Sequence, residues 1–339
     1  MLSLKSVRHS LFCFLAAFFM NLCMFSCVYP QVIHKKTETL EKRVVELEKE
    51  LARLKKEIDF YNTNLPEHLT LCEKTIPLKR DDIRERFERE MFQLLENKGL
   101  MVILIKRYFK YYNVINDEIK RFGLPSDLIF LVLAESYLNP RALSKAEAAG
   151  LWQFIKETGK KEGLFINDHI DERYNIKKAT RSALKHLKKL NEEFNDWFIA
   201  MAAYNAGAAR LRDAISNQDT RDFFDLFLPE ETERYIFRII SLKEIILNRE
   251  KYGIRVEEKS LYTPVVLKEV MIDVEKETHI SVLAKAMDVS FKVFRDVNLH
   301  LRRYRLPKGV YTINVLGDKY SAFMKNIKDY PYVRVLSEK

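Results

Sequence analysis

The decapeptide LIFLVLAESY, residues 128–137, places a single carboxylate in an otherwise apolar run. A helix that is apolar nearly all round is typical of a helix buried in a protein core. Pro140 follows closely and predicts the end of this helix. Glu135 shares a stripe with Leu128 and Leu131 at helical spacing, so we expect its side chain where a core residue would stand.

A carboxyl group in this position has the chemistry of a general acid. Desolvation by the aliphatic neighbours should raise the pKa of Glu135, and so should the negative end of the helix dipole. A carboxyl that keeps its proton near neutral pH can protonate a glycosidic oxygen, as the acid of lysozyme does from an apolar pocket. The residues alone leave a second interpretation open, in which Glu135 pairs with an arginine or reaches solvent at the helix end.

Helical patterns also precede this segment. From residue 65 to 122, Asp81-Asp82 opens one expected helix and the run from Leu100 to Ile119 supplies the apolar face of another. Gly123-Leu124-Pro125-Ser126-Asp127 then breaks the pattern. Its proline suits the first turn of the next helix, and its serine and aspartate suit the N-terminal amides.

The composition indicates a mainly α-helical chain with several modules. Its 339 residues are 47% hydrophobic and 31% charged, with only nine glycines, which argues against an all-β fold. The net charge of +10 is spread among nearly as many acids, without the dense basic tract of a nucleic-acid binder. We therefore expect no nucleic-acid partner, and at most weak attraction to an anionic membrane or a polymer bearing carboxylates.

The first 27 residues have the plan of a secretory signal. Lys5 and Arg8 precede the uncharged run from Leu11 to Met20, which is short for a membrane-spanning helix. Met24-Phe25-Ser26-Cys27 resembles a loose bacterial lipobox, although its first two residues are bulky. We expect lipidation at Cys27, with simple cleavage or an uncleaved anchor as alternatives.

Cysteine and histidine usage agrees with export and predicts no cofactor. After removal of the signal and acylation of Cys27, only Cys72 would remain, so no intramolecular disulfide is expected, and Cys72 should be a small core residue. The seven histidines lack metal-ligand spacing, so we predict no metal site.

A heptad pattern follows the signal, within residues 40–58. Its apolar positions alternate steps of four and three residues, with charged residues between them: Leu40, Val44, Leu47, Leu51, Leu54 and Ile58. Three heptads are near the minimum for a free-standing coiled coil. The segment could therefore form a homo-oligomer or lie as an amphipathic helix on the globular body.

Three ordered motifs in the chain resemble those of the goose-lysozyme-like lytic transglycosylases. The first comprises Glu135-Ser136-Tyr137-Leu138-Asn139-Pro140 and Gly150-Leu151-Trp152-Gln153-Phe154, the second is Ala202-Ala203-Tyr204-Asn205-Ala206-Gly207, and the third is Leu228-Pro229-Glu230-Glu231-Thr232 with Tyr235. The resemblance is greatest to the membrane-bound lytic murein transglycosylase type D group and covers roughly residues 65–248. It implies a lysozyme-like helical domain that acts on peptidoglycan.

The resemblance also implies a reaction and its residues. The reaction is cleavage of the β-1,4 bond between N-acetylmuramic acid and N-acetylglucosamine, which leaves a 1,6-anhydromuramoyl end. Glu135 would be the only catalytic acid and base. The residues expected to line the sugar site are Ser144, Gln153, Tyr204 and Asn205, with Trp152 offering a flat face for a sugar ring. Each has a structural alternative, in the core for the aromatic residues or as a cap for Ser144 and Asn205.

One carboxylate could suffice for this reaction, although glycosidases usually need two. The acetamido group of the substrate would support the oxocarbenium ion, and its own C6 hydroxyl would attack C1. Glu135 would first donate a proton and later remove one. Two alternatives are a muramidase that uses water and a non-catalytic cell-wall adaptor.

Two residues depart from the family pattern. Glu147 stands where the family usually has glycine, and Lys156 where it often has proline. If the turn needs a positive φ, Glu147 would be strained, so residues 144–150 are expected to follow another path. Glu147 would also be a second carboxylate for direct hydrolysis.

The segment after Gly253 predicts a small β-α-α-β unit. Strands are expected at residues 270–274 and 310–315, and short helices near 281–287 and 290–297. The unit resembles a degenerate LysM module, in which Lys276-Glu277 replaces the usual Gly-Asp turn. It could bind peptidoglycan or serve only as a structural appendage.

These observations divide the chain into five expected segments. They are a lipoprotein-type signal at 1–27, a coiled coil or linker at 28–64, a helical region at 65–123, a lysozyme-like catalytic domain at 124–250 and a LysM-like module with its tail at 251–339. The expected location is the cell envelope, as a lipoprotein of the outer membrane that faces the periplasm, although the residues do not themselves choose between the membranes.

Overall fold

A computed structural model describes residues 30–61 and 65–338 of the chain. The chain divides into two compact units, residues 1–64 and residues 65–339. The expected signal, with the lipidation site Cys27, lies outside the described residues. In the two described ranges, no helix combines the length and the apolar character needed to cross a membrane.

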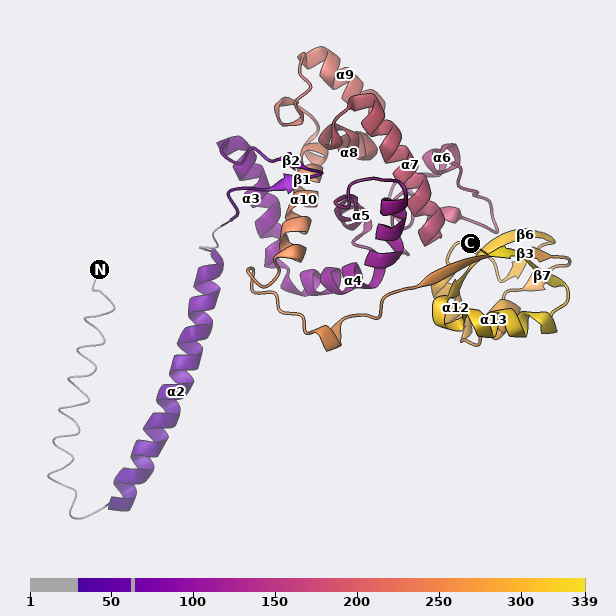
Figure 1. The fold of residues 1–339 in the computed structure, drawn as a ribbon. Helices are drawn as coiled ribbons and strands as arrows, with labels where there is room; N and C mark the ends of the chain where they lie inside the picture. The colour runs from indigo at the N-terminus through magenta and orange to yellow at the C-terminus, as the bar shows by residue number, and fades with distance from the viewer. Residues whose placement is uncertain (1–29, 62–64, 339) are drawn as a thin grey trace. The chain divides into compact units, whose positions relative to one another are not determined.

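The first unit is described as one helix, α2 (Pro30–Tyr61), which runs through the whole heptad segment (Figure 1). Leu40, Val44, Leu47 and Leu51 are exposed along it. Ion pairs within one helical turn, such as Lys42 with Glu38, occupy the charged positions between them. The side chains of Leu54 and Ile58 lie outside the described residues. A helix at the heptads is therefore observed, and its self-association stays a prediction.

Helices dominate residues 65–250 of the second unit, so the fold is mainly α, as the composition predicts. A small hairpin of β1 (Thr70–Leu71) and β2 (Lys74–Thr75) precedes them. The helices are α3 (Asp81–Glu96), α4 (Lys98–Arg121), α5 (Leu128–Ser136), α6 (Lys156–Lys161), α7 (Ile176–Phe194), α8 (Trp197–Ala206), α9 (Ala208–Gln218) and α10 (Glu230–Leu247), with short 3-10 turns at Glu172–Tyr174 and Phe223–Asp225. A further 3-10 turn, Glu258–Ser260, lies between α10 and the C-terminal part.

Side-chain caps begin several of these helices. Asn97 accepts a hydrogen bond from Leu100 N at the start of α4, and Asn175 accepts one from Lys178 N at the start of α7. Asp196 accepts from the first amides of α8. Each cap satisfies an amide that has no partner within its helix, which explains why the chain turns into helices at these residues.

Helix α5 is the centre of the helical body. All six residues from Leu128 to Leu133 are buried, as the apolar run predicts, and α5 packs against α4 and α10 (Figure 1). Its start differs from our expectation, because Asp127 does not cap it. The Asp127 carboxylate instead accepts hydrogen bonds from Cys72 N, at 2.7 Å, and from Lys243 Nζ, at 2.8 Å. It thus ties the β1–β2 hairpin and α10 to α5. Cys72 is buried, as predicted.

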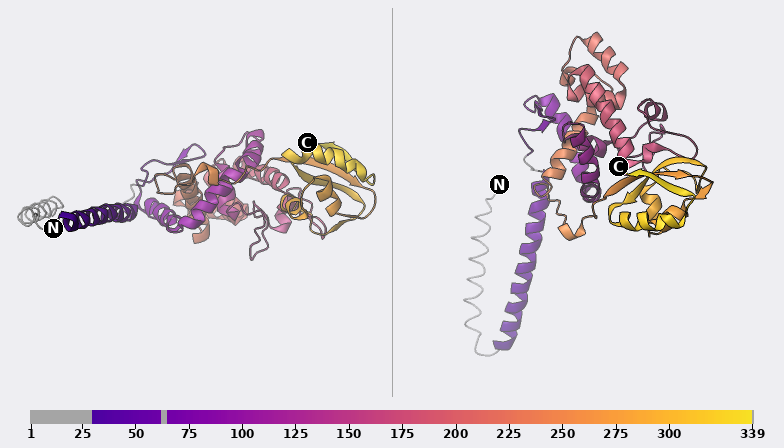
Figure 2. Two further views of the ribbon diagram at one scale, coloured as in Figure 1. Left: turned by 90° about the horizontal axis from the view of Figure 1, so that it is seen from below. Right: turned by 45° about the vertical axis from the view of Figure 1, so that its right-hand side comes forward.

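The C-terminal part, from residue 267, is a small α+β module. Its antiparallel sheet has the order β6-β3-β7, formed by Gly309–Leu316, Leu267–Val274 and Val333–Glu338. Helices α11 (Ser281–Ala286), α12 (Phe291–Val297) and α13 (Tyr320–Asn326) complete it, with the short pair β4 (Thr278–His279) and β5 (Arg305–Leu306). Figure 2 shows this module, in orange and yellow, from two further sides.

The expected β-α-α-β order is present in this module, but the expectation was incomplete. It omitted α13 and β7, which follow the second long strand. Strand β7 pairs with β3, whose residues lie about 60 or more positions earlier in the chain. Such long-range pairing has no local signature in the sequence.

We expect Asp127→Ala to lower the free energy of unfolding by roughly 2 kcal/mol, because two hydrogen bonds to a charged carboxylate are lost. Urea unfolding at pH 7 measures the change. Asp81→Ala is the control, since Asp81 is exposed in the first turn of α3 and should cost no more than about 0.5 kcal/mol. Equal losses in the two variants would contradict the tying role of Asp127.

Candidate active site

Glu135 lies in the last turn of α5, where the buried helix reaches the surface. The residue is half-buried, whereas the six residues from Leu128 to Leu133 are buried. The chain leaves the helix at once, because Tyr137 has a φ of 51° in the left-handed region. Arg107 donates to the carbonyl of Tyr137 at 3.0 Å and so satisfies one of the free carbonyls at this end. The geometry therefore fixes the position of Glu135.

The partner of the Glu135 carboxylate is a phenol rather than a cation. Tyr235, on α10, donates its hydroxyl proton to Oε1 of Glu135. Burial raises the pKa of Glu135 to about 7, although the Tyr235 hydrogen bond and the charge of Arg238 lower it and the charge of Glu231 raises it. A carboxyl group with this pKa is about half protonated at neutral pH, as a general acid requires.

Tyr235 is the site residue that our sequence reasoning missed. It appears in the third motif, but nothing in the sequence indicated a contact with Glu135, which lies 100 residues earlier. Tyr235 is buried, and burial and the neighbouring carboxylate raise its pKa well above the ordinary value. The phenol therefore keeps its proton and remains a donor to the carboxylate.

Tyr204 and Asn205 reach the same region from α8. Burial, with a contribution from the charge of Glu135, raises the pKa of Tyr204. Its hydroxyl donates to the carbonyl of Trp152 at 2.7 Å, and its ring meets the edges of Trp152 and Phe154. Asn205, the next residue, is half-buried at the end of the helix. The second motif thus lies beside the first.

Ser144 and Gln153 belong to the loop that follows α5. Ser144 is exposed, and its hydroxyl accepts a hydrogen bond from Ala148 N at 3.0 Å, so it closes a turn. The Gln153 side chain donates to the carbonyl of Gly150 at 2.7 Å. Both side chains therefore shape the loop.

Parts of this chain resemble a known protein family and several known proteins. Residues 113–227 match the family model described as the transglycosylase SLT domain. We refer to this matched range below as the SLT domain. The range includes Glu135, the loop after α5 and Tyr204, whereas Tyr235 lies downstream of it.

Curated relatives agree with this match over part of their length. The chain is 35% identical over 182 residues to the membrane-bound lytic murein transglycosylase D of Escherichia coli strain K12, and equally so to that of strain CFT073. The alignment covers 52% of this chain and 39% of each relative, so the chain spans well under half of their length.

Solved structures show a partial likeness. The 70 kDa soluble lytic transglycosylase of Escherichia coli is 16% identical, with a TM-score of 0.38 over 51% of this chain and 32% of that one. An inactive mutant of the lytic transglycosylase Slt of Pseudomonas aeruginosa is 23% identical, with a TM-score of 0.33 over 45% of this chain and 26% of that one.

Trp152 of the SLT domain does not offer the flat face that we expected. Its side chain is fully buried, and its Nε1 donates to the hydroxyl of Thr180 at 2.9 Å. A sugar ring cannot stack on an indole that core residues already cover on both faces. Trp152 contributes instead through its backbone carbonyl, which accepts the hydrogen bond of Tyr204.

The Glu147 turn has the positive φ for which a different path of the loop was expected. Glu147 has a φ of 59°, and Arg173 donates to its carbonyl at 2.7 Å. The left-handed conformation is thus kept without glycine, and an arginine contact compensates part of its cost. Lys156 is exposed at the first position of α6, where proline would also fit.

The SLT domain presents no grouping suited to a transition metal. In residues 30–61 and 65–338, no three His, Cys, Asp or Glu side chains gather closely enough to hold a metal ion.

The free energy of unfolding of Glu135→Gln should increase relative to that of the wild type as the pH rises. A carboxyl group with a folded pKa of about 7 and an unfolded pKa near 4.3 binds more protons when folded, so the wild type loses stability between these values. We expect the difference in free energy of unfolding to move by roughly 2 kcal/mol in favour of the variant between pH 5 and pH 8. Urea unfolding at both values measures it. Glu147→Gln, at an exposed position, should show no comparable movement.

Tyr235→Phe should raise the pKa of Glu135 above about 7. The hydrogen bond from the phenol stabilises the ionised carboxylate, so its loss favours the protonated form. A carbon-13 NMR titration of the glutamate carboxyl groups reports the value. Tyr204→Phe is the matched control, because that hydroxyl donates to a carbonyl. A pKa that stays the same in Tyr235→Phe would contradict the contact.

Proposed function

We propose that this protein is a peptidoglycan lytic transglycosylase that cleaves the β-1,4 bond between N-acetylmuramic acid and N-acetylglucosamine and leaves a 1,6-anhydromuramoyl product. The observation that carries the proposal is the Glu135 carboxyl in an SLT domain, half-buried, paired with a phenol and with a pKa raised to about 7. The relatives named as lytic murein transglycosylases support the same reaction.

Glu135 acts twice in this proposal. It first gives its proton to the glycosidic oxygen, and the bond from that oxygen to C1 of the muramic acid breaks. The C6 hydroxyl of the same sugar then attacks C1 and returns a proton to Glu135, so the carboxyl ends in its starting state. Tyr235 holds the carboxylate while it is ionised. Ser144, Gln153, Tyr204 and Asn205 are proposed to line the sugar site.

A muramidase that uses water is the second candidate, because a further carboxylate lies near Glu135. The charge of Glu231, on the first turn of α10, acts on Glu135 and raises its pKa. Glu147 is a less suitable base, since it is exposed in the turn after α5. The chemical form of the ends of the product strands distinguishes the two reactions. Anhydro ends indicate the transglycosylase, and reducing ends indicate the muramidase.

The C-terminal module is proposed to bind peptidoglycan. Tyr304 is 66% exposed, and its ring lies parallel to that of His279 with the centroids 6.1 Å apart. Phe291 adds a third ring to this group. The exposed ring of Tyr304 offers a flat apolar face to a sugar. The resemblance of the module to LysM remains part of the proposal.

The proposed location is the cell envelope. The relatives carry the words membrane-bound in their names, and the lipobox-like sequence supports a lipid anchor at Cys27 and an outer-membrane lipoprotein that faces the periplasm. Self-association through residues 40–58 is supported by the exposed apolar stripe on α2. Peptidoglycan strands and the membrane are thus the proposed partners.

Digestion of purified sacculi tests the enzyme proposal. We expect the wild type to release strands with anhydro ends, seen by mass spectrometry, and Glu135→Gln to be slower by about a hundredfold or more. Glu147→Gln, the control, should keep most of the activity. Equal rates for wild type and Glu135→Gln would remove Glu135 from the mechanism. Binding of sacculi without any digestion by either protein would favour the non-catalytic adaptor.

A further inference from the structure

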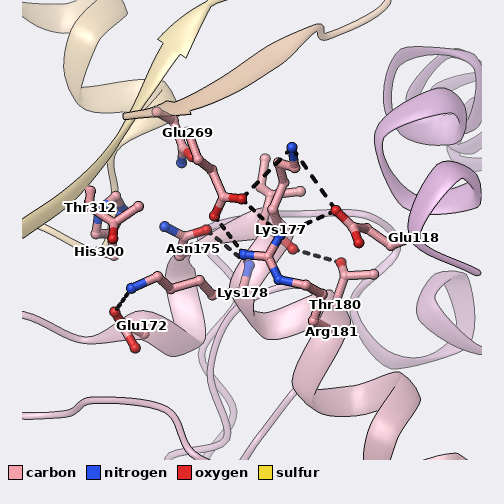
Figure 3. Close-up of polar contacts among 12 residues, drawn as sticks. Glu118, Glu172, Asn175, Lys177, Lys178, Thr180, Arg181, Glu269, His300 and Thr312 are labelled. Carbon is pink, nitrogen blue, oxygen red and sulfur yellow. Dashed lines mark hydrogen bonds and ion pairs between the residues drawn. The ribbon is translucent and has the colours of Figure 1, made fainter. Parts of the chain in front are cut away.

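The C-terminal module is joined to the SLT domain by four charged residues, of which the two acids are buried (Figure 3). Glu269, on β3, receives two hydrogen bonds from the guanidinium of Arg181, at 2.7 and 2.6 Å. Arg181 also donates to Glu118, on α4, at 3.2 Å, and Lys177 lies within 4.0 Å of both acids. The two acid side chains are only 2% and 3% exposed. Buried charges with matched partners hold one orientation, because any other would leave a charge unpaired.

Backbone hydrogen bonds make a second contact between the two parts. The turn at residues 298–303 of the module runs beside residues 165–174 of the SLT domain. Asp171 N donates to the carbonyl of His300 at 2.8 Å, and Arg302 N donates to that of His169 at 2.7 Å. Ile170 and Leu301 form an antiparallel bridge between these bonds. Residues 298–303 of the module thus pair in antiparallel fashion with residues 165–174 of the SLT domain.

The same SLT segment holds the loop that carries the proposed sugar-binding residues. Arg173 donates to the carbonyls of Glu147 and Phe154, at 2.7 and 3.1 Å, and Asp171 fixes its guanidinium at 2.7 Å. Gly150 of the loop lies so close to the carbonyl of Arg173 that a Cβ there would stand 2.0 Å from it. Any shift of this segment therefore moves the loop.

Side chains of the module also touch the loop directly. Leu299 packs against Ala149, in the loop, and Tyr174, in the SLT segment. The guanidinium of Arg302 lies over the ring of Tyr174, 4.5 Å from its centroid. Asp296 of α12 pairs with Arg141, just after α5. The loop from Ser144 to Gln153 is thus supported from the side of the module.

We propose that the C-terminal module is a positioning element of the active site, in which residues 298–303 hold residues 165–174 and thereby fix the loop that carries Ser144 and Gln153. The part of this proposal that concerns substrate rests on the proposed function. Glu135 and Tyr235 stand on α5 and α10, which are anchored by other contacts. Loosening the module should therefore weaken substrate positioning more than proton transfer.

Hydrogen exchange of the full-length protein tests whether the module holds the loop, and this measurement does not depend on enzymatic activity. We expect the amides of residues 144–154 to exchange at least about tenfold faster in Leu299→Ala, and about threefold faster in Arg302→Gln. Arg334→Gln is the matched control, because it removes the same charge from an exposed position on β7 of the module. Melting curves show whether each variant remains folded. Unchanged exchange in Leu299→Ala while the protein is folded would overturn the proposal, whether or not the wild type digests peptidoglycan.

Steady-state kinetics on soluble glycan strands then separates a positioning role from a merely structural one. In Arg302→Gln, KM should rise about threefold or more with kcat nearly constant, whereas Arg334→Gln should resemble the wild type. Loss of kcat alone, or equal effects in both variants, would overturn the positioning role. If the wild type has no activity, the proposed function fails, and the exchange result still decides whether the module supports the loop.

Discussion

Burial of the Glu135 carboxyl group is the constraint on which the site depends. A carboxylate taken out of water must pair, hydrogen-bond or keep its proton. The Glu135 carboxylate accepts a hydrogen bond from Tyr235, and burial raises its pKa to about 7, so that it also keeps its proton more readily. Helix α5 imposes this environment, because its apolar residues fill the core and leave only the last turn near the surface.

Several elements that are distant in sequence supply the groups around this carboxyl. Tyr235 and Arg238 stand one turn apart on α10, and Tyr204 comes from α8. The charge of Arg238 lowers the pKa of Glu135, and Glu90, on α3, accepts a hydrogen bond from the Arg238 guanidinium at 3.4 Å. Glu90 also pairs with Arg234. Helix α3, upstream of the SLT domain, therefore belongs to the electrostatic environment of the site.

In the loop after α5, tertiary contacts hold residues other than glycine at a positive φ. Glycine is the residue that most readily adopts a positive φ, yet Glu147 and Gln153 both do so here. Contacts from Arg173 and from the Gln153 side chain to backbone carbonyls hold the loop in this form. Leu299 of the C-terminal module packs against Ala149 of the same loop, so the module and the loop are in direct contact.

Much of the secondary structure and the position of the acid could be predicted. The apolar run from Leu128 predicted a buried helix with Glu135 on its core-facing stripe, because periodicity is local information. The role expected of Trp152 was wrong, since a motif cannot tell which face of an indole the rest of the fold will cover. Asp127 was likewise expected to cap α5, but distant donors on the β1–β2 hairpin and α10 compete for its carboxylate.

The amino-acid sequence by itself determined the helices, the heptad segment, the order of most of the C-terminal module and the identity of the candidate acid. These depend on residue type and spacing within a few turns of chain. Only the tertiary structure decided the partner of Glu135, the burial of Trp152 and the docking of the module through Arg181 and Glu269. The reason is that hydrogen bonds and desolvation depend on which distant side chains arrive at one place, and spacing along the chain does not carry that information.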